Sequence, residues 1–339
     1  MILRGIDFGP VFDATGLRNF DGEGYRHHKI LRWLGLDLAG STFVAKTTTL
    51  YARAGNLPLE DDGVTLKELS PRCILPNLQF KNLPISIRMF LKGLMGNAVA
   101  LSGPGAEFVI TKIWQHITEK FFMSFMPISK TAPERMLEVG EFVALLRRHL
   151  PHFKAPAVGL QINYSCPNVD SEHAKLFGAK FVEEVRASLD IAAILGIPLG
   201  PKFNVLAPIK AVKEISEHAA CDFICIPNTL LWGSLPEKIN WEKLFGTNTS
   251  PLAEFGGGGF SGPQFFPLAL KWVKQARNEG ITKPINVGGG IFKADDVDLV
   301  KAAGGSSIFL SASVTNLRPW RTKGINARAH QLFEEGETQ

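Results

Sequence analysis

The segment GLQINYSCPNVD (residues 159–170) ends a short apolar run with a hydroxyl, a thiol, a proline and an asparagine. Cys166 in this segment has two interpretations, a buried core cysteine or a thiol placed for chemistry. A thiol has an ordinary pKa of about 8.5, and it can act as a base near neutral pH when its surroundings lower that pKa modestly. The choice depends on which residues the fold places beside Cys166.

Other polar or cationic residues also follow short apolar runs. They are Lys46 and Thr47, Asn163, Lys202, Asn228 and Thr229, the glycines 288–290, and the pair Ser311 and Ala312. The set holds two lysines and no carboxylate, which favours an anionic ligand. A glycine-rich turn lets backbone N–H groups approach a phosphate, although a single glycine triplet is also typical of a plain tight turn. Asparagine both donates and accepts hydrogen bonds, so several of them suit a pyrimidine or a cyclic imide.

The elements that would position these residues alternate between strand-like and helical patterns. We expect strands within 9–16, 40–49, 119–127, 155–164, 197–206, 221–228, 283–291 and 306–313, and helices within 179–195, 207–220, 263–280 and 293–305. Repeated β–α units predict a parallel sheet covered by helices, and eight strands predict a (β/α)8 TIM barrel. The alternative, an open doubly wound sheet, is weakened because no G-x-G-x-x-G turn follows the first strand.

We expect one domain over residues 1–339, with insertions at about 50–118 and 229–262. Their Pro and Gly content favours ordered loops, hairpins or lids over the C-terminal face of the barrel. Active sites of such barrels lie where the strands end and the β–α loops begin. In this fold the polar residues listed above converge on one mouth, which favours the catalytic interpretation of Cys166.

The charge of +5 is modest, with 37 basic and 32 acidic residues, so we expect no nucleic-acid partner. Residues 80–96 are basic and apolar, and could meet a membrane surface or a partner; we expect ordinary packing in the protein instead. No apolar stretch approaches the roughly 18 residues that a membrane span needs, and no signal peptide is evident.

Four cysteines are too few for a disulfide scaffold. Cys221 and Cys225 lie in a strand-like segment, so we interpret them as core thiols. The chain holds no set of cysteines spaced for an iron–sulfur centre. A reducing, cytoplasmic setting fits best.

Several motifs, in order along the chain, resemble those of the dihydroorotate dehydrogenase family. NYSCPN (163–168) is similar to the N-x-[SC]-[SC]-P-N signature of that family. The other similar stretches are FDATG (12–16), VAKTTTLYARAGNLP (44–58), NAVALSGPG (97–105), PKFNV (201–205), IPNT (226–229), GGFSGP (258–263) and NVGGGI (286–291). Each match is weak alone, whereas the ordered set covers most of the chain.

The resemblance implies a soluble, cysteine-base enzyme of class 1 type that binds flavin mononucleotide (FMN) and oxidises dihydroorotate to orotate. Cys166 would remove the C5 proton while a hydride leaves C6 for flavin N5, with Lys46 between the flavin and the substrate. The implied substrate-binding residues are Asn97, Val99, Ala100, Leu101, Asn163, Asn168, Asn228 and Thr229. The implied cofactor-binding residues are Ala14, Thr15, Gly16, Lys46, Thr47, Asn163, Lys202, Ile226, Ser261, Gly262, Gly289, Gly290, Ser311 and Ala312.

The sequence departs from the family pattern at three places. Ala100 stands where the family has glycine, the loop after Asn168 differs, and Ser311-Ala312 replaces a Gly-Thr phosphate turn. Another dihydropyrimidine or cyclic amide is therefore an alternative substrate. A phosphate-binding barrel that serves as a scaffold is the alternative from outside the enzymes. The electron acceptor stays open between fumarate, oxygen, a quinone and a partner flavoprotein, and a homodimer is compatible with the sequence.

Overall fold

The computed structural model describes residues 1–77, 83–165 and 179–334. Its main sheet has eight parallel strands in the order β3-β14-β13-β10-β9-β8-β7-β4. The bounds are β3 (Val11–Asp13), β4 (Phe43–Val44), β7 (Phe121–Phe125), β8 (Val158–Asn163), β9 (Leu199–Lys202), β10 (Ile224–Ile226), β13 (Ile285–Val287) and β14 (Ser307–Leu310). A parallel bridge between Phe12 and Thr42 closes the circle between β3 and β4. The predicted (β/α)8 barrel is confirmed, and each expected strand range contains one observed strand.

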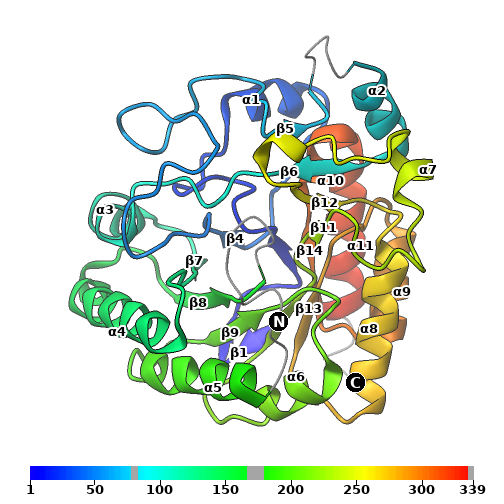
Figure 1. Cartoon of the computed structure of the whole chain (residues 1–339). Helices are drawn as coiled ribbons and strands as arrows, with labels where there is room; N and C mark the ends of the chain where they lie inside the picture. Colours follow the sequence, from blue (N-terminus) through cyan, green and yellow to red (C-terminus); the bar gives the residue numbers. More distant parts are fainter. Residues whose placement is uncertain (78–82, 166–178, 335–339) are drawn as a thin grey trace.

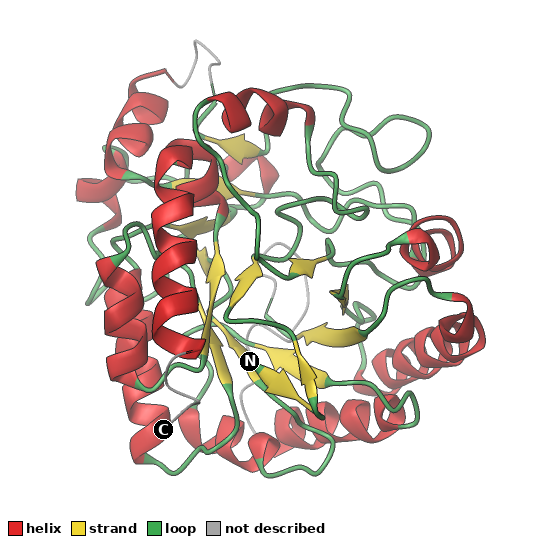
Figure 2. Cartoon of the chain, turned by 180° about the vertical axis from the view of Figure 1, so that it is seen from behind, coloured by secondary structure: helices red, strands yellow, loops and turns green. Residues whose placement is uncertain are grey.

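Helices surround this barrel (Figures 1 and 2). The ring consists of α4 (Ala132–His149), α5 (Ala179–Ala193), α6 (Ile209–Ser216), α8 (Phe266–Asn278), α9 (Asp295–Ala303) and α11 (Thr322–Glu334), each packed on the next. The start of α4 shows why the chain turns helical there: Thr131 and Glu134 form a reciprocal capping box, and Pro133 occupies the first turn. The four helices expected from periodicity correspond to α5, α6, α8 and α9.

Aromatic rings fill the barrel interior where neighbouring strands carry glycine. A Cβ atom at Gly159 would lie 2.2 Å from the Phe122 ring, and one at Gly200 would lie 2.3 Å from the Phe223 ring. These glycines therefore make room for phenylalanines that no larger residue could accommodate without movement. An N-terminal hairpin of β1 (Ile2–Leu3) and β2 (Ile6–Asp7) adds Met1 and Leu3 to the same apolar cluster. Burial raises the pKa of Cys225 to about 11, in agreement with its interpretation as a core thiol.

The two predicted insertions join in one antiparallel sheet of order β11-β12-β6-β5. The first insertion supplies β5 (Ile74–Leu75) and β6 (Met95–Asn97), and the second supplies β11 (Leu230–Leu231) and β12 (Gly259–Ser261). In the central pair, Asn97 lies opposite Gly259 and Met95 lies opposite Ser261. A second apolar cluster, with Leu75, Phe245 and Phe260 in it, packs around this sheet. We refer to it below as the cover sheet.

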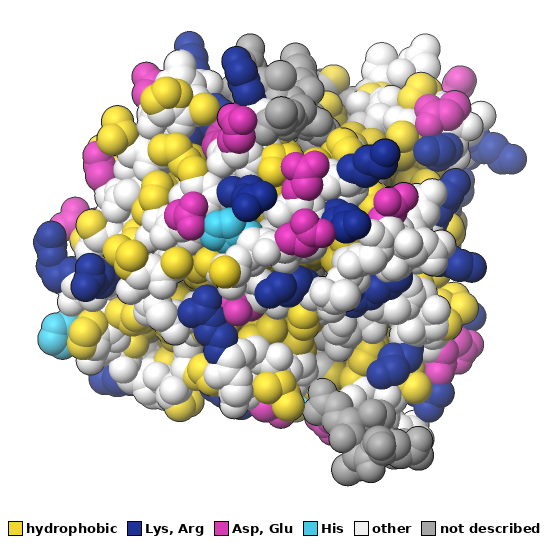
Figure 3. Space-filling view, turned by 90° about the horizontal axis from the view of Figure 1, so that it is seen from below, with side chains coloured by type: hydrophobic (Ala, Val, Ile, Leu, Met, Phe, Trp, Pro, Cys, Tyr) yellow, Lys and Arg dark blue, Asp and Glu magenta, His cyan; other side chains and the backbone are white. Residues whose placement is uncertain are grey.

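Two helices lie above the cover sheet at the top of Figure 1, α1 (Arg26–Trp33) and α2 (Leu83–Lys92). The remaining elements are α3 (Ala106–Phe108), α7 (Trp241–Phe245), α10 (Ala312–Leu317) and the short helical turns Val109–Ile113, Trp114–His116, Leu150–His152, Ala253–Phe255 and Pro319–Arg321. Seen from below, the opposite face of the molecule intermixes basic, acidic and apolar side chains (Figure 3). No helix in the described residues is both long and apolar enough to span a membrane.

Candidate active site

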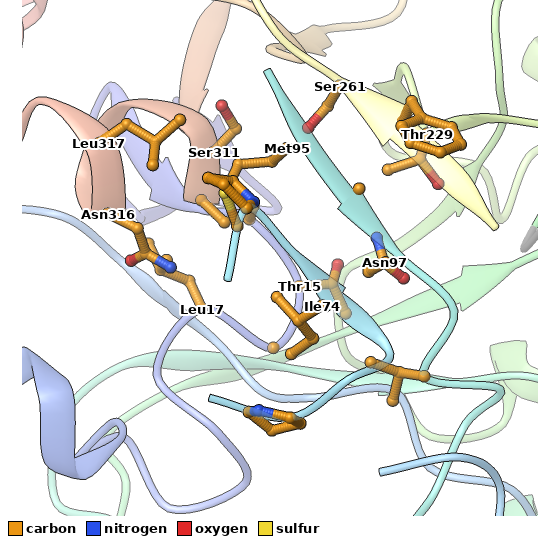
Figure 4. Close-up of a pocket in the computed structure, with 18 of the residues that line it drawn as sticks. Thr15, Leu17, Ile74, Met95, Asn97, Thr229, Ser261, Ser311, Asn316 and Leu317 are labelled. Atoms are coloured by element: carbon orange, nitrogen blue, oxygen red, sulfur yellow. The ribbon is translucent and has the colours of Figure 1, made fainter. Parts of the chain in front are cut away.

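A cavity of about 750 Å³ lies at the carboxyl ends of the barrel strands, between the barrel and the cover sheet. Most of the predicted site residues line it: Ala14, Thr15, Gly16, Lys46, Thr47, Asn97, Val99, Ala100, Leu101, Asn163, Lys202, Asn228, Thr229, Ser261, Gly289, Ser311 and Ala312. Figure 4 shows Asn97 and Thr229 on one side of the pocket, and Asn316 and Leu317 on the other. The structure thus brings together residues from nine separate parts of the sequence.

Three of the predicted residues that the structure describes, Ile226, Gly262 and Gly290, do not line this cavity. Ile226 is fully buried in β10 and points its side chain into the core cluster. A Cβ atom at Gly290 would lie 2.7 Å from the carbonyl oxygen of Gly262, so these two glycines pack against each other behind the cavity wall. Cys166 and Asn168 lie outside the described residues, because the described segment 83–165 ends at Ser165.

Lys202, at the end of β9, is only 5% exposed and extends across the barrel mouth toward the first strand. Its Nζ donates a hydrogen bond to Thr15 Oγ1 at 3.0 Å, and Thr15 Oγ1 donates to Gln161 Oε1 at 2.7 Å. The ammonium group also lies 5.6 Å from the centroid of the Phe309 ring. The Thr15 hydroxyl and the Phe309 ring therefore hold this cation at the mouth of the barrel.

Lys46 follows β4 and is 8% exposed. Its Nζ donates to the carbonyl oxygen of Ser102 and lies 4.7 Å from the Phe20 ring centroid. A Cβ atom at Gly16, which has φ +82°, would lie 3.3 Å from Lys46 Cγ. The tight turn after β3 therefore packs directly on the lysine stem and holds it along the cavity wall.

Two asparagines meet at the ends of β8 and β10. Asn228 Nδ2 donates to Asn163 Oδ1 at 3.1 Å, and the same oxygen accepts the backbone N–H of Ser165 at 3.1 Å. Asn228 Oδ1 in turn accepts the N–H of Thr229 at 2.9 Å. Because these contacts fix which end of each amide is oxygen, the Nδ2 group of Asn163 is directed away from the pair.

Small residues form another wall of the cavity. Gly289 has φ +73°, and a Cβ atom there would lie 2.5 Å from Pro227 Cγ, so no larger residue fits. Ser311 is the N-cap residue of α10, and its Oγ lies 2.7 Å from Ser313 Oγ. The first N–H groups of a helix lack partners within the helix. The start of α10 therefore adds backbone donors to the cavity wall near the turn at Gly289.

The segment after β6 brings Asn97, Val99, Ala100 and Leu101 to the cavity. Ala100 and Leu101 both have left-handed backbones, with φ +54° and +59°. This region costs an L-residue with a side chain about 1–2 kcal/mol. The Ala100 carbonyl accepts a hydrogen bond of 2.8 Å from Arg53 Nε, which holds the strained turn in place. The family glycine expected at this position therefore corresponds to a backbone that glycine would adopt without strain.

Sequence reasoning did not identify the polar group that α1 and α10 contribute, which consists of Tyr25, His27, His28 and Asn316. Burial lowers the pKa of His28 to about 4, helped by the neighbouring His27, while Asn316 opposes the shift. His28 Nδ1 faces the backbone N–H of Tyr25 at 3.4 Å. The Nε2 atoms of His27 and His28 are both buried, and among the described residues neither has a hydrogen bond of ordinary geometry. The only sequence signal was the His-His pair in a segment without apolar periodicity.

The cavity as a whole suits an elongated anionic ligand with a planar polar ring. None of its described lining residues is an aspartate or a glutamate, whereas two lysines lie in its wall. Its described lining also holds several amides, among them Asn97, Asn163 and Asn228. Among the described residues, no group of three or more His, Cys, Asp or Glu side chains could hold a metal ion.

Comparisons with known proteins show the family to which the chain belongs. A family model described as Dihydroorotate dehydrogenase matches residues 82–329. The chain is 25% identical over 334 residues to the "Dihydroorotate dehydrogenase B (NAD(+)), catalytic subunit" of Anoxybacillus flavithermus, covering 96% of this chain and 88% of the relative. It is also 25% identical over 334 residues to the "Dihydroorotate dehydrogenase A (fumarate)" of Lacticaseibacillus paracasei, covering 97% of this chain and 95% of that relative. A solved structure of DHODH from Eimeria tenella in complex with ferulenol has a similar fold, with a TM-score of 0.64 at 15% identity over 98% of this chain and 84% of that one.

Proposed function

The chain belongs to the dihydroorotate dehydrogenase family, and we propose that it catalyses the FMN-dependent oxidation of dihydroorotate to orotate in pyrimidine biosynthesis. The observation that carries the proposal is the composition of the cavity: its described lining residues include no Asp or Glu, and they include Lys46, Lys202 and the joined amides of Asn163 and Asn228. Orotate and dihydroorotate are anionic rings with alternating N–H and C=O groups, so both features of the cavity match them.

The residues present fit an FMN group. The Gly289 backbone lies in the cavity wall with no side chain to cover it, and the N-terminal turn of α10 would present N–H groups to a phosphate. Lys202 would lie against the electron-rich edge of the ring, with Ala14, Thr15, Gly16 and Thr47 along it. Bound FMN would supply the hydride acceptor. A fixed lysine charge favours the reduced ring because that ring carries more negative charge.

The substrate would bind between the barrel and the cover sheet. Asn97, Asn163 and Asn228 would hold the ring and its carboxylate, with Asn168 as a fourth amide from outside the described residues. Val99, Ala100, Leu101 and Thr229 would form the adjoining wall. Amide groups in this wall would pair with the N–H and C=O groups of the ring, which favours a pyrimidine over an apolar ring.

Cys166 would act as the base in this reaction. It is the residue after Ser165, whose N–H and hydroxyl are both fixed, by Asn163 Oδ1 and by the carbonyl oxygen of Lys202. The thiolate would accept the C5 proton of dihydroorotate while the C6–H bond breaks and its electron pair leaves as hydride. The C5–C6 double bond of orotate forms between the two carbons.

The electron acceptor is a further part of the proposal. One relative is called a fumarate enzyme and another the catalytic subunit of an NAD⁺ enzyme, so acceptors differ within the family. We propose that a separate electron acceptor reoxidises this chain, that the chain works in the cytoplasm, and that it pairs as a homodimer.

A second candidate keeps the fold and cofactor but changes the ring. Ala100 lines the cavity at a position where the family pattern has glycine, so its methyl group takes up space that glycine would leave to a ligand. A smaller dihydropyrimidine or a cyclic amide would then be the better substrate. This candidate rests on Ala100 alone.

Anaerobic stopped-flow mixing of the purified flavoprotein with dihydroorotate tests the proposal. We expect the flavin absorbance to bleach within the time of one catalytic turnover. Protein that purifies without flavin and takes up no FMN would refute the cofactor assignment. Flavin that is reduced by another dihydropyrimidine but not by dihydroorotate would support the second candidate.

A further inference from the structure

The loop that follows β3 consists of residues 14–17, and all four of them line the cavity. Figure 4 shows Thr15 and Leu17 of this loop in the wall of the pocket. An ion pair joins the residues on either side of the loop, because Arg18 Nε donates to Asp13 Oδ2 at 2.5 Å. Neither Asp13 nor Arg18 is among the described residues that line the cavity. We call residues 14–17 the β3 loop.

The ion pair of Asp13 and Arg18 is buried and has further fixed partners. The Asp13 side chain is fully buried, and that of Arg18 is 12% exposed. Ser41 Oγ donates to Asp13 Oδ1 at 2.9 Å, and Arg18 Nη1 donates to Glu119 Oε1 at 3.0 Å. The guanidinium carbon of Arg18 lies 5.0 Å from the centroid of the Phe43 ring. The ion pair is therefore fixed to the segments around the starts of β4 and β7.

The two lysines of the cavity wall both contact the β3 loop or its immediate neighbours. Lys202 Nζ donates to Thr15 Oγ1 at 3.0 Å. The backbone N–H of Lys46 donates to the carbonyl oxygen of Asn19 at 2.8 Å. A Cβ atom at Gly16 would lie 3.3 Å from Lys46 Cγ, so the loop backbone packs on the stem of that lysine. A displacement of the loop would therefore move contacts of both cations at once.

We propose that Asp13 and Arg18 are positioning residues for the oxidation of the substrate: their ion pair fixes the β3 loop, and the loop places the two cavity lysines. Neither residue of the pair would touch a ligand, so both act through the loop. This inference rests on the proposed function for the role of the lysines. The place of the lysines is a property of the folded chain, and it can be measured without the reaction.

The chemistry of the pair suits positioning better than it suits stability. Removing two charges from water costs free energy that their attraction only roughly returns, so a buried ion pair adds little stability compared with apolar side chains of similar size. Arginine, however, has a planar guanidinium whose N–H groups point in fixed directions. Here they reach Asp13 Oδ2, Glu119 Oε1 and, at 3.5 Å, the carbonyl oxygen of Ser41. Acceptors on three segments thus define where the loop begins and ends.

Substitution of Arg18 breaks the pair without changing the cavity wall. Burial raises the pKa of Asp13, whereas the Arg18 guanidinium and the Ser41 hydroxyl oppose that rise. Arg18→Gln therefore leaves the buried carboxyl without its arginine partner, and Arg18→Lys keeps a charge but not the planar group. Asp13→Leu with Arg18→Met replaces both charges by apolar side chains, which buried pairs often tolerate without loss of stability. This double variant stands in for Arg18→Gln if the single change prevents folding.

Acetylation of lysines in the full chain, followed by mass spectrometry, measures the first consequence. In Arg18→Gln and in the double variant we expect Lys202 and Lys46 to react about threefold faster or more, because an ammonium on a flexible stem becomes mobile when its fixed contacts move. The exposed Lys274 on α8 should react as in the parent. Unchanged reactivity of Lys202 and Lys46 in a folded variant would overturn the proposal, even where Tm falls, and would leave the pair a purely structural role.

Anaerobic flavin reduction by dihydroorotate measures the second consequence. We expect Arg18→Gln to slow the reduction about tenfold, and Arg18→Lys to recover part of the rate. In a Thr15→Val background the same Arg18→Gln change should slow it by less than about threefold, since Thr15 is the contact through which the loop acts on Lys202. Equal factors in the two backgrounds would show that the pair does not act through the loop.

Arg4→Gln is the matched control, because it breaks another arginine–aspartate pair. Arg4 Nε lies 3.0 Å from Asp222 Oδ2, between the β1–β2 hairpin and the residues before β10. This variant should change neither the lysine reactivities nor the rate of flavin reduction. A parent protein whose flavin is absent, or is not reduced by dihydroorotate, would refute the proposed function alone, because the lysine reactivities still test the effect of the pair.

Discussion

Asn228 donates a hydrogen bond of 3.1 Å to Asn163, which ties the end of β10 to the end of β8 across the mouth of the barrel. Each amide therefore fixes the orientation of the other. A ligand that pairs with one of them depends on both, because a freed amide can turn and present the wrong edge.

Replacing Asn228 with alanine should lower kcat/KM for dihydroorotate by about 10- to 100-fold, the equivalent of one or two ligand hydrogen bonds. Asn163→Ala should have an effect of similar size, and the double variant should lose less than the sum of the two. Steady-state kinetics of the three variants measures this coupling. Asn278→Ala, on the exposed end of α8, is the control. Strict additivity of the two losses would argue against a joint role.

The position of Lys202 depends on Thr15, which accepts its hydrogen bond at 3.0 Å and passes one to Gln161. Thr15→Val keeps the shape and removes both bonds, and we expect slower flavin reduction by about tenfold or more with weaker FMN retention. Thr15→Ser restores the hydroxyl and should recover most of the rate. Anaerobic flavin reduction and fluorescence of released FMN report the two effects. A Val variant as fast as the Ser variant would show that the hydroxyl does not position the lysine.

Ala100→Gly should stabilise the protein by up to about 1 kcal/mol, because φ +54° is strained for alanine and not for glycine. The control Ala98→Gly, at a fully buried position without a positive φ, should destabilise the protein. Urea unfolding of both variants gives the two free energies. The same Ala100→Gly variant should also widen the wall of the cavity, so a change in the preference between ring substrates would be visible in kcat/KM. A loss of stability in Ala100→Gly equal to that in Ala98→Gly would contradict the strain argument.

His28 should make the folded state less stable in mild acid. Its pKa is about 4 in the folded protein and 6.5 when exposed, so the unfolded state binds the proton first as the pH falls. His28 therefore does not lower the free energy of unfolding above pH 6.5. As the pH falls toward 4, its protonation in the unfolded state lowers that free energy by up to about 3 kcal/mol. His28→Gln should flatten that decline in Tm against pH, while His152→Gln, an exposed histidine, should leave it unchanged. If Tm falls equally with pH in the parent and in His28→Gln, then His28 is not the cause of the decline.

The sequence predicts the barrel well because its strands are apolar and, from β8 to β14, the amphipathic helices α5, α6, α8 and α9 separate them. It predicts the cover sheet poorly. The strands of that sheet have two or three residues each, too short for any periodicity, and they pair segments that are far apart in sequence. The helix α1 is missed for a related reason: His27 and His28 point into the cavity while Ile30 and Trp33 are exposed, so apolar residues do not mark its buried side. Gly262 and Gly290, which the motifs assign to the cofactor, do not line the cavity, and a Cβ atom at Gly290 would lie 2.7 Å from the Gly262 carbonyl oxygen.

The pairing of β6 with β12 also has an evolutionary consequence. Asn97 and Gly259 are partners in one ladder although they belong to different insertions, and a Cβ atom at Gly96 would lie 2.6 Å from the Phe260 ring. A change of residue or length in one insertion is therefore acceptable only with a compensating change in the other. Across relatives, we expect these two regions of the gene to vary together while the barrel between them diverges independently.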